Sequence, residues 1–517
     1  MLPTLSMRSV TWMVLALALA SAPCSADLRC GEATGPSSLN PLYVRDMSSL
    51  RAVELIYEGL VTPPEAGEVA PLLAESWEVS GDGTAVTFRL KRGVQWHDGA
   101  PFAARDVVFT VTAAEDPRSF SPLRSQFEVF SGAQALDDQT VQIRFRHKVL
   151  NPLLHFDFKV LPSHLYPGGV VDPVAGQGRV VGTGPFRFVR WASSGEITLE
   201  ANPNYHRAGQ PGISRVELAP VPDDSIRTEL LRYGAIDLIP QVRPRDIPAL
   251  EELTRVRLYP YSTLSYAFLG LNFRTAALRE PAVRKALALG LARGEMLKAH
   301  YGNRGAVISG PFPPSSWAYN FGVKPWPYDP HAAASALDGA GLADRDKDGV
   351  REFQGAPLGL RLVSVARDEA QKAVVLDIQQ QLRNIGIPVA VRFLEPMAWK
   401  KAVFEDHDFD LVLSEWTFDH SVNIYTLFHS AEAGPGQNNM GAYANPEVDR
   451  LLEDSRSAES SESLRAVYGE LHRILHEDIP YVFLWSLHRY ASVSSRIENV
   501  RLHPFYFFTY VGTWKEK

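Results

Sequence analysis

Cysteine is scarce in this chain: Cys24 and Cys30 are its two cysteines among 517 residues. If a leader is cut after Ala26, only Cys30 remains, which leaves no internal disulfide and no cysteine-based metal site. A chain of this length can bury large cores without covalent cross-links. We therefore expect hydrophobic packing to hold the fold together.

An excess of positive charge is also missing. The formal net charge is −7 and the isoelectric point about 6.1. This balance argues against nucleic acid as a partner, because nucleic-acid binding needs a basic face. The 45% hydrophobic and 21% charged residues are close to the globular average. At about one domain per 150 residues, the length suggests three units.

Long apolar runs are absent downstream of the N-terminus. No later segment has about 18 uninterrupted apolar residues, the length that a membrane span requires. The first 26 residues are typical of a secretory signal, because Arg8 precedes a short apolar core and small residues precede a cut after Ala26. We expect a soluble periplasmic protein with a cleavable signal. The alternative is a lipid anchor on Cys24, which Pro23 disfavours because a small residue is expected before an anchored cysteine.

Complete catalytic motifs are missing as well. The chain has no G-x-S-x-G, no Walker loop and no complete G-x-G-x-x-G. Adjacent His97 and Asp98 are more typical of a turn than of a catalytic dyad. His476 begins HEDIP, which lacks the second histidine of a zinc-protease helix. Asp344–Gly355 begins like a calcium loop but ends on glycine where a bidentate glutamate belongs, so we predict a solvated turn and no metal site.

The chain does contain alternating strand and helix patterns. In residues 84–90, Val86, Phe88 and Leu90 share one face of a predicted half-buried strand. Residues 281–297 predict one helix with proline in its first turn. The apolar run FDLVLSEW suits a buried strand. Because strands and helices alternate without a repeat period, we predict an α/β architecture.

The stretch SEWTFDH, residues 414–420, contains the residue types of a hydrolase site. Ser414, Asp419 and His420 could form a triad only if one strand and its loop brought them together. No nucleophile elbow accompanies them. A secreted hydrolase therefore stays an alternative that motifs do not support.

Seven segments, in the same order along the chain, resemble one known family. They include APLLAESWEVSGDGTAVTFRLKRGVQWHDGAPFAARDVVFT, VGTGPFRFVRW, LNFRTAALREPAVRKALALGLARGE and FDLVLSEWTFDHSVNIYTLFHS. The chain resembles the family 5 extracellular solute-binding proteins, which serve ABC importers of oligopeptides, dipeptides and related solutes. The resemblance covers essentially the whole mature chain.

The resemblance implies a two-lobed periplasmic-binding-protein fold, α/β in class, of type II and cluster C-like, with an extra subdomain on lobe I. Residues 1–26 would be the signal peptide and residues 65–180 the subdomain. Residues 269–484 would form lobe II. Lobe I would be discontinuous, built from residues 27–64, 181–268 and 485–517.

The family's function implies binding without catalysis. The chain would capture a peptide or peptide-like solute between two lobes and deliver it to a membrane permease. Its implied partners are the solute and the ABC permease and ATPase subunits at the inner membrane. We expect a monomer, with no cofactor, no metal and no nucleic acid.

The resemblance also implies where the ligand binds. Peptide-binding relatives carry W-x-x-D, in which the aspartate pairs with the α-ammonium of the peptide; here the pattern runs from Trp416 to Asp419. Backbone groups near Thr417 and Phe418 would pair with an extended ligand, as an added strand does. Further predicted ligand-binding residues are His420 and Asn423 on the same side, and Tyr43, Arg45, Asp46 and Met47 on the opposing wall.

One departure from the family keeps a second ligand class open. Relatives carry further acidic residues after the aspartate, whereas this chain has Ser421-Val422-Asn423. Fewer negative charges should weaken selection for cationic ligands. The same scaffold could therefore bind a nickel chelate, heme, a sugar or an opine.

Overall fold

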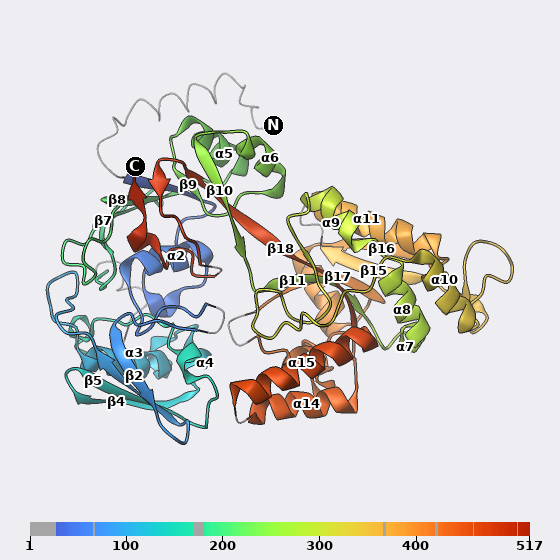
Figure 1. Ribbon diagram of the computed structural model, residues 1–517, viewed down its shortest axis with the longest axis horizontal. Helices are drawn as coiled ribbons and strands as arrows, with labels where there is room; N and C mark the ends of the chain where they lie inside the picture. The colour runs from blue at the N-terminus through green and yellow to red at the C-terminus, as the bar shows by residue number, and fades with distance from the viewer. Residues whose placement is uncertain are drawn as a thin grey trace. The chain divides into compact units, whose positions relative to one another are not determined.

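The computed structural model describes residues 27–65, 68–169, 171, 180–365, 369–418, 422–458, 460–503 and 505–517 (Figure 1). Unit 1 comprises the chain up to Tyr261 together with Arg489–Lys517, and unit 2 is Ser262–His488. The chain thus forms two compact units where its length suggested three. The predicted signal peptide and Cys24 lie outside the described residues. The domain boundaries that the resemblance implies stay predictions.

The main sheet of unit 1 begins at the first described residues. Its order is β18-β9-β1-β8-β7-β6, where only the last part of β18 belongs to this unit. Parallel pairing joins β1 to β8, and antiparallel pairing joins β8 to β7 and β7 to β6. The bounds are β1 Asp27–Glu32, β6 Phe186–Trp191, β7 Ile197–Ala201, β8 Arg215–Pro220, β9 Leu238–Ile239 and β18 Tyr481–Ser494. The sequence patterns VGTGPFRFVRW and EITLEAN also predict two strands joined by ASSG, and the structure confirms them as β6 and β7.

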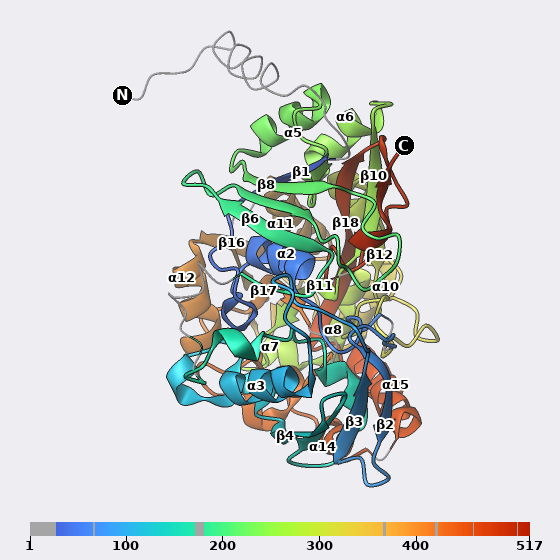
Figure 2. The same cartoon turned by 90° about the vertical axis from the view of Figure 1, so that its left-hand side faces the viewer.

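A second, antiparallel sheet of unit 1 has the order β2-β3-β5-β4. Val86 and Phe88 are fully buried and Leu90 nearly so, whereas Arg89 is exposed, as the alternation predicted. Helix α3 packs on β4 and β5 of this sheet (Figure 2). The bounds are β2 Ala74–Val79, β3 Ala85–Leu90, α3 Ala104–Glu115, α4 Arg124–Phe127, β4 Phe130–Asp137 and β5 Thr140–Phe145.

Two of the remaining helices of unit 1, α2 and α5, begin at side-chain caps. The Asp46 carboxylate accepts the Ser49 N–H and starts α2, Met47–Ile56. The apolar spacings from Leu50 to Leu60 also predict a helix that Pro63 and Pro64 stop, whereas α2 ends earlier, at Ile56, because Tyr57 is already extended. Asp223 caps α5, Asp224–Tyr233. The other elements are α6 Ile247–Glu251, β10 Val256–Ser262, β19 Ile497–Glu498 and β20 Lys515–Glu516.

Unit 2 is built on one mixed sheet in the order β16-β15-β17-β11-β18, with β12 paired to β18. Both faces of its central strands are buried, which explains their continuous apolar sequences. Along β17, Leu411 and Leu413 contribute to one core and Val412 to another; β18 alternates in the same way. The bounds are β11 Ser265–Leu271, β12 Gly305–Val307, β15 Leu360–Val365, β16 Val389–Leu394 and β17 Leu411–Thr417.

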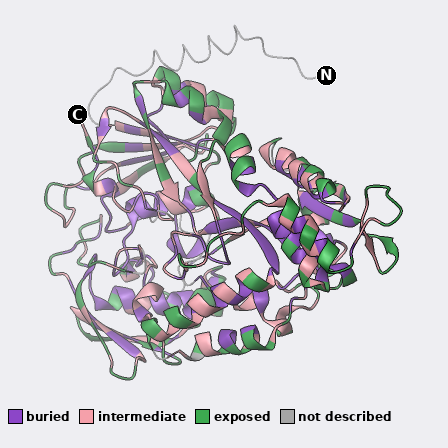
Figure 3. Cartoon of the chain, turned by 45° about the vertical axis from the view of Figure 1, so that its right-hand side comes forward, coloured by how far each residue is buried: buried purple, intermediate pink, exposed green. Residues whose placement is uncertain are grey.

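Each of the two cores of unit 2 also contains side chains from helices that pack on the sheet. Helices α8 to α11 contribute to the core that contains Leu411, and α15 contributes to the core that contains Val412. Figure 3 shows buried residues in the strands and mixed buried and exposed residues along α14 and α15. The bounds are α7 Ala276–Arg279, α8 Pro281–Leu289, α9 Arg293–Tyr301, α10 Pro330–Gly339, α11 Glu369–Asn384, α12 Pro396–Lys400, α13 Tyr425–Phe428, α14 Pro446–Ser457 and α15 Ser461–Asp478.

The single helix predicted over residues 281–297 is wrong, because the structure breaks it between α8 and α9. The Ala292 N–H donates to the Gln381 side chain at 2.7 Å and not to a helix carbonyl. A Cβ at Gly290 would lie 2.9 Å from Ile385 Cδ1, so this position packs closely against the end of α11. The break therefore comes from contacts with a helix about 90 residues away, which local periodicity does not encode.

Candidate functional site

The predicted site residues of unit 2 lie at the end of strand β17 and in the segment that follows it. Along one edge of β17, the neighbouring strand β15 pairs with only the first part of the strand. Strand β17 pairs with β11 along its whole length, from Leu411 to Thr417. Its pairing with β15 joins only Leu411 and Val412 to that strand. Among the described residues, no strand continues this pairing beyond Val412.

The backbone of Thr417 faces this edge. The Phe418 N–H donates to the Leu264 carbonyl at 2.7 Å, on the β11 side. Successive residues of a strand direct their backbone groups to opposite sides. The N–H and C=O of Thr417 therefore point away from β11, and the residue is exposed. A ligand with an extended backbone could pair there.

Aromatic packing fixes the end of β17. The Trp416 ring stacks on Phe268 with centroids 5.9 Å apart and is half-buried. Phe418 stacks on Tyr266 with centroids 5.6 Å apart and is only 8% exposed. Its side chain is thus part of the core, so any contact of Phe418 with a ligand would come from its backbone. These stacked rings hold the backbone around Thr417 in place.

The residues that follow β17 include the predicted anchor. Asp419 and His420 lie outside the described residues, so their roles stay predictions. Asn423 is described: its Oδ1 accepts the N–H of Tyr425, the first residue of the short helix α13, at 2.9 Å. Its side-chain oxygen therefore already has a local structural role.

The predicted residues of unit 1 form a loop that leads into α2. Tyr43 is 7% exposed, and its hydroxyl donates to the Val171 carbonyl at 2.6 Å and contacts the Ser119 carbonyl. Burial raises the pKa of Asp46, but hydrogen bonds from Ser37 and Ser49 outweigh burial and hold that pKa below its usual value. Tyr43 and Asp46 are thus both engaged in structural hydrogen bonds.

The other two predicted residues of this loop are more accessible. Arg45 is exposed. Met47, the first residue of α2, is 40% exposed. Of the four predicted residues in unit 1, these two side chains are therefore the ones that a ligand could reach most readily.

The apparent catalytic pairs have separate structural partners. His97 Nε2 lies 3.0 Å from the Gly184 carbonyl and its Nδ1 accepts the Gly182 N–H at 3.2 Å. Asp98 pairs instead with His164 Nε2 at 2.7 Å. Burial lowers the pKa of His97, so its ring is neutral at neutral pH. The interpretation of this stretch as a turn is confirmed.

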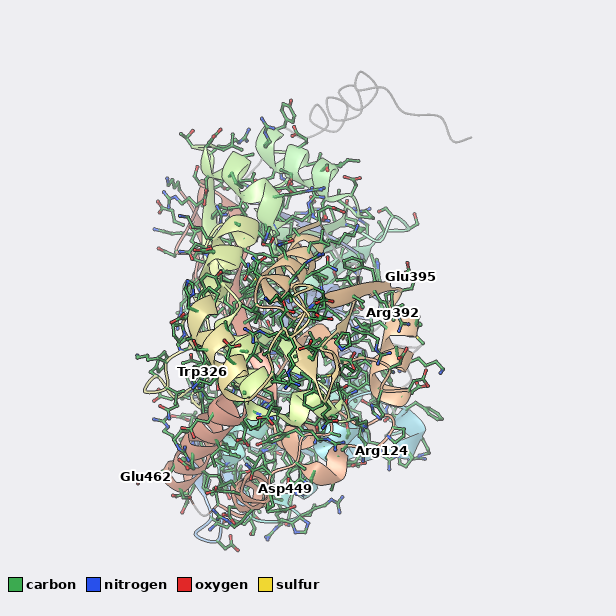
Figure 4. All side chains as sticks on the ribbon, turned by 90° about the vertical axis from the view of Figure 1, so that its right-hand side faces the viewer. Arg124, Trp326, Arg392, Glu395, Asp449 and Glu462 are labelled. Carbon is green, nitrogen blue, oxygen red and sulfur yellow. The ribbon has the colours of Figure 1, made fainter. Side chains whose placement is uncertain are left out.

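His476 likewise has a structural role. Its Nδ1 lies 2.8 Å from the Ser309 carbonyl. Its ring stacks on Trp326, which Figure 4 labels in the segment before α10, with centroids 5.0 Å apart. The side chain is thus held within unit 2 by a hydrogen bond and a stacked ring.

The acidic loop forms a turn, as predicted. Its three aspartates, Asp344, Asp346 and Asp348, bring ligand atoms within 4.8 Å of one another. The same carboxylates accept backbone N–H groups of the loop, including that of Gly349. The next segment is the small hairpin of β13, Glu352–Phe353, and β14, Ala356–Pro357. Gly355, which occupies the twelfth loop position, has no side chain to offer a cation.

Sequence reasoning missed a group of buried ionisable side chains in unit 1. Glu54 and Glu58 lie one turn apart on and just after α2, and both are less than one-tenth exposed. These two glutamates line a cavity within unit 1, and Lys159, from a distant part of the chain, lines it too. The available signal was two glutamates four residues apart in the apolar run RAVELIYEGL.

Comparisons with known proteins agree with the resemblance. Residues 68–436 match the family model described as bacterial extracellular solute-binding proteins, family 5 Middle. The chain is 27% identical over 494 residues to the oligopeptide-binding protein AppA of Bacillus subtilis, covering 92% of this chain and 89% of that protein. It is 26% identical over 508 residues to heme-binding protein A of Haemophilus influenzae, covering 93% and 90%.

A solved structure supports the fold along the whole length. The structure of B. subtilis AppA in complex with a nonapeptide matches with a TM-score of 0.71 at 26% identity, covering 96% of this chain and 100% of that chain. The predicted mixed α/β fold of the cluster C binding proteins is thereby confirmed. Among the described residues, no helix combines the length and the apolar character needed to cross a membrane. The chain belongs to the bacterial extracellular solute-binding proteins of family 5, which are non-enzymatic binding components of ABC transporters.

Proposed function

We propose that this protein binds a peptide or peptide-like solute in the periplasm and delivers it to the permease of an ABC importer. The observation that carries the peptide part is the edge of β17, which β15 leaves uncovered after Val412. The AppA relative, whose name and solved complex are those of an oligopeptide binder, supports the same ligand class. The ligand would be held through its backbone, so different side chains could be accepted.

An extended peptide can use the edge as a strand of a sheet does. Neighbouring strands lie about 4.8 Å apart and exchange N–H and C=O bonds. Thr417 directs both of its backbone groups to that side, and it stands one residue beyond the ring of Trp416. Backbone pairing supplies affinity without side-chain selectivity, which suits a transporter of mixed peptides.

The α-ammonium of such a peptide needs an anionic partner. We assign this role to Asp419, on the pattern from Trp416 to Asp419. A buried ammonium without a carboxylate loses more in desolvation than it gains in contacts. Loss of one partner of a buried, hydrogen-bonded charge pair costs about 2–5 kcal/mol, which corresponds to a fall in affinity of about 30-fold or more.

Calorimetric titration separates the two contributions. Asp419→Asn should weaken binding of free-amine peptides by about 30-fold or more and leave N-acetylated peptides nearly unchanged. Asp346→Asn, in an exposed loop of the same unit, serves as the matched control. Equal losses for both kinds of peptide would remove Asp419 from the anchoring role.

Backbone pairing has its own test. Peptides that are N-methylated at one position each lose a donor at that position only. Strand addition predicts that affinity falls at alternate positions, because successive residues face opposite sides. Uniform loss, or none, along the series would contradict pairing with β17.

Transport also requires that the ligand change the state of the protein. A micromolar solute binds with about −8 kcal/mol, which is enough to favour one conformation strongly yet still permit release. A ligand shifts this equilibrium only if it binds one conformation better than the other. The permease would then recognise the ligand-bound form.

A second candidate ligand class rests on a different observation. Heme-binding protein A of H. influenzae covers as much of the chain as the peptide binder does. The sequence Ser421-Val422-Asn423 also lacks the carboxylates that follow the W-x-x-D aspartate in peptide-binding relatives. Titration with heme, followed by absorbance, tests this candidate. Saturable, equimolar heme binding together with no response to peptides would favour it over the peptide proposal.

A further inference from the structure

A cavity of about 70 Å³ lies within unit 1. One wall is the end of α2, and another is the C-terminal segment 508–513. Lys159, Tyr205 and Arg207 complete the polar part of the lining. Segments that are far apart in the sequence thus converge on this cavity.

Glu54 contributes a carboxyl group of which only one oxygen has a hydrogen-bond partner among the described residues. Its Oε2 accepts the Phe508 N–H at 2.8 Å. Its Oε1 is buried and has no hydrogen-bond partner among the described residues. Burial raises the pKa of Glu54 to about 8, and the opposing charge of Lys159 does not cancel that effect. At neutral pH the side chain is therefore a neutral acid with an O–H to donate.

Lys159 contributes a second donor without an acceptor. It is 8% exposed, and its Nζ lies 5.4 Å from the centre of the Tyr506 ring. No salt bridge or hydrogen bond joins its ammonium to any residue in the part of the chain that the structure describes. An ammonium carries three donors, and burying it without an acceptor is costly.

The nearby carboxylate of Glu58 does not supply that acceptor. It accepts the Tyr205 hydroxyl at 2.8 Å and lies 3.0 Å from His206 Nε2. Burial raises the pKa of Glu58, but these two partners outweigh burial and hold that pKa below its usual value. Glu58 is therefore ionised and already satisfied at neutral pH.

The cavity thus presents donors and lacks a matching acceptor. A water molecule needs about 15 Å³ of such volume, so 70 Å³ has room for a ligand of about four or five non-hydrogen atoms. We propose that the cavity binds a small monocarboxylate anion of acetate size, whose oxygens accept hydrogen bonds from Lys159 Nζ and from the Glu54 carboxyl group. This site is independent of the peptide proposal.

The charge of Glu54 should control this binding. An ionised Glu54 would place a second negative charge beside the bound carboxylate, so affinity should fall as pH rises past about 8. Arg207 is half-buried at the same cavity and does not titrate in this range. The other charged groups that act on Glu54 and Lys159 are Glu32, Arg51, Asp157 and Glu58.

The test is a titration of the full chain with ¹³C-labelled acetate, followed by broadening of the acetate signal, with sodium chloride held at matched ionic strength. At pH 6.5 we expect saturable binding to the wild type. Lys159→Met should weaken it at least tenfold, whereas Lys148→Met, an exposed lysine of the same unit, should leave it unchanged. Acetate broadening that is equal in wild type and Lys159→Met would overturn the proposal.

A second variant keeps the proposal testable if Lys159→Met does not fold. Glu54→Gln retains a donor and carries no charge at any pH. Burial lowers the pKa of Lys159, so the Lys159 ammonium also titrates as pH rises. The wild type should therefore lose acetate binding at lower pH than Glu54→Gln, in which only the titration of Lys159 remains. Parallel pH profiles for the two proteins would equally overturn the proposal, because they would show that Glu54 does not face the anion.

Discussion

Glu54→Gln should stabilise the protein at neutral and alkaline pH. Burial raises the pKa of Glu54 from 4.5 to about 8 in the folded state. The stability that the protonated carboxyl contributes is fully present below pH 4.5 and is lost as pH rises through about 8. A difference of about 3.5 pKa units corresponds to about 5 kcal/mol, an upper estimate, at 1.36 kcal/mol per unit.

The assay compares thermal unfolding of wild type and Glu54→Gln between pH 5 and 9. The difference in unfolding free energy should be below about 1 kcal/mol at pH 5, should grow to pH 8 and should then level off. A change of 1 kcal/mol shifts the melting temperature by about 2–4 °C for a unit of this size, so the effect is measurable. Glu75→Gln, an exposed carboxylate of the same unit, is the control. A flat difference across the whole range would refute the assignment of a buried, protonated Glu54.

Three further predictions concern the residues around the two sites. Phe418→Ala should lower the free energy of unfolding by about 3–5 kcal/mol, because the ring is part of the core. The control Phe321→Ala, at a ring that is 64% exposed, should not lower it. A loss of peptide affinity without a loss of stability would place the Phe418 side chain in the ligand site instead. Asp46→Ala should cost about 1 kcal/mol of stability through the lost helix cap, and Asp46→Asn should restore most of it. Glu58→Gln should lower the free energy of unfolding by about 3 kcal/mol at pH 7. Because the pKa of Glu58 is depressed in the folded state, this loss of stability should shrink as pH falls below 4.5. A loss that stays the same at acidic pH would argue against an ionised Glu58.

Local sequence patterns predicted the strands and most helices because their signals are short-range. The alternation of Val86, Phe88 and Leu90 reports one buried face of β3. The apolar run before Trp416 reports a strand buried on both faces. Such patterns need no knowledge of which element packs against them.

Other features depend on contacts that the local sequence does not contain. The break after Leu289 follows from Gln381, and the burial of Phe418 follows from Tyr266. Tyr43, which is predicted to bind the ligand, donates a hydrogen bond to the Val171 carbonyl. Each of these partners lies on a different element, so only the tertiary structure shows them.

The cavity of unit 1 illustrates the same limit. Glu54 and Lys159 are about 100 residues apart, and the Phe508 N–H comes from the far end of the chain. A glutamate on an apolar helix face indicates a buried carboxyl group but does not identify the residues around it. The raised pKa of Glu54 exists only because these segments exclude water together.

The most direct test of peptide binding is native mass spectrometry of the protein purified without refolding from the cells that produce it. We expect a mixture of bound masses that fragment as peptides, because backbone pairing with β17 tolerates many side chains. A single bound mass that fragments as heme, a metal chelate or a sugar would contradict peptide binding and would favour the alternative ligand class.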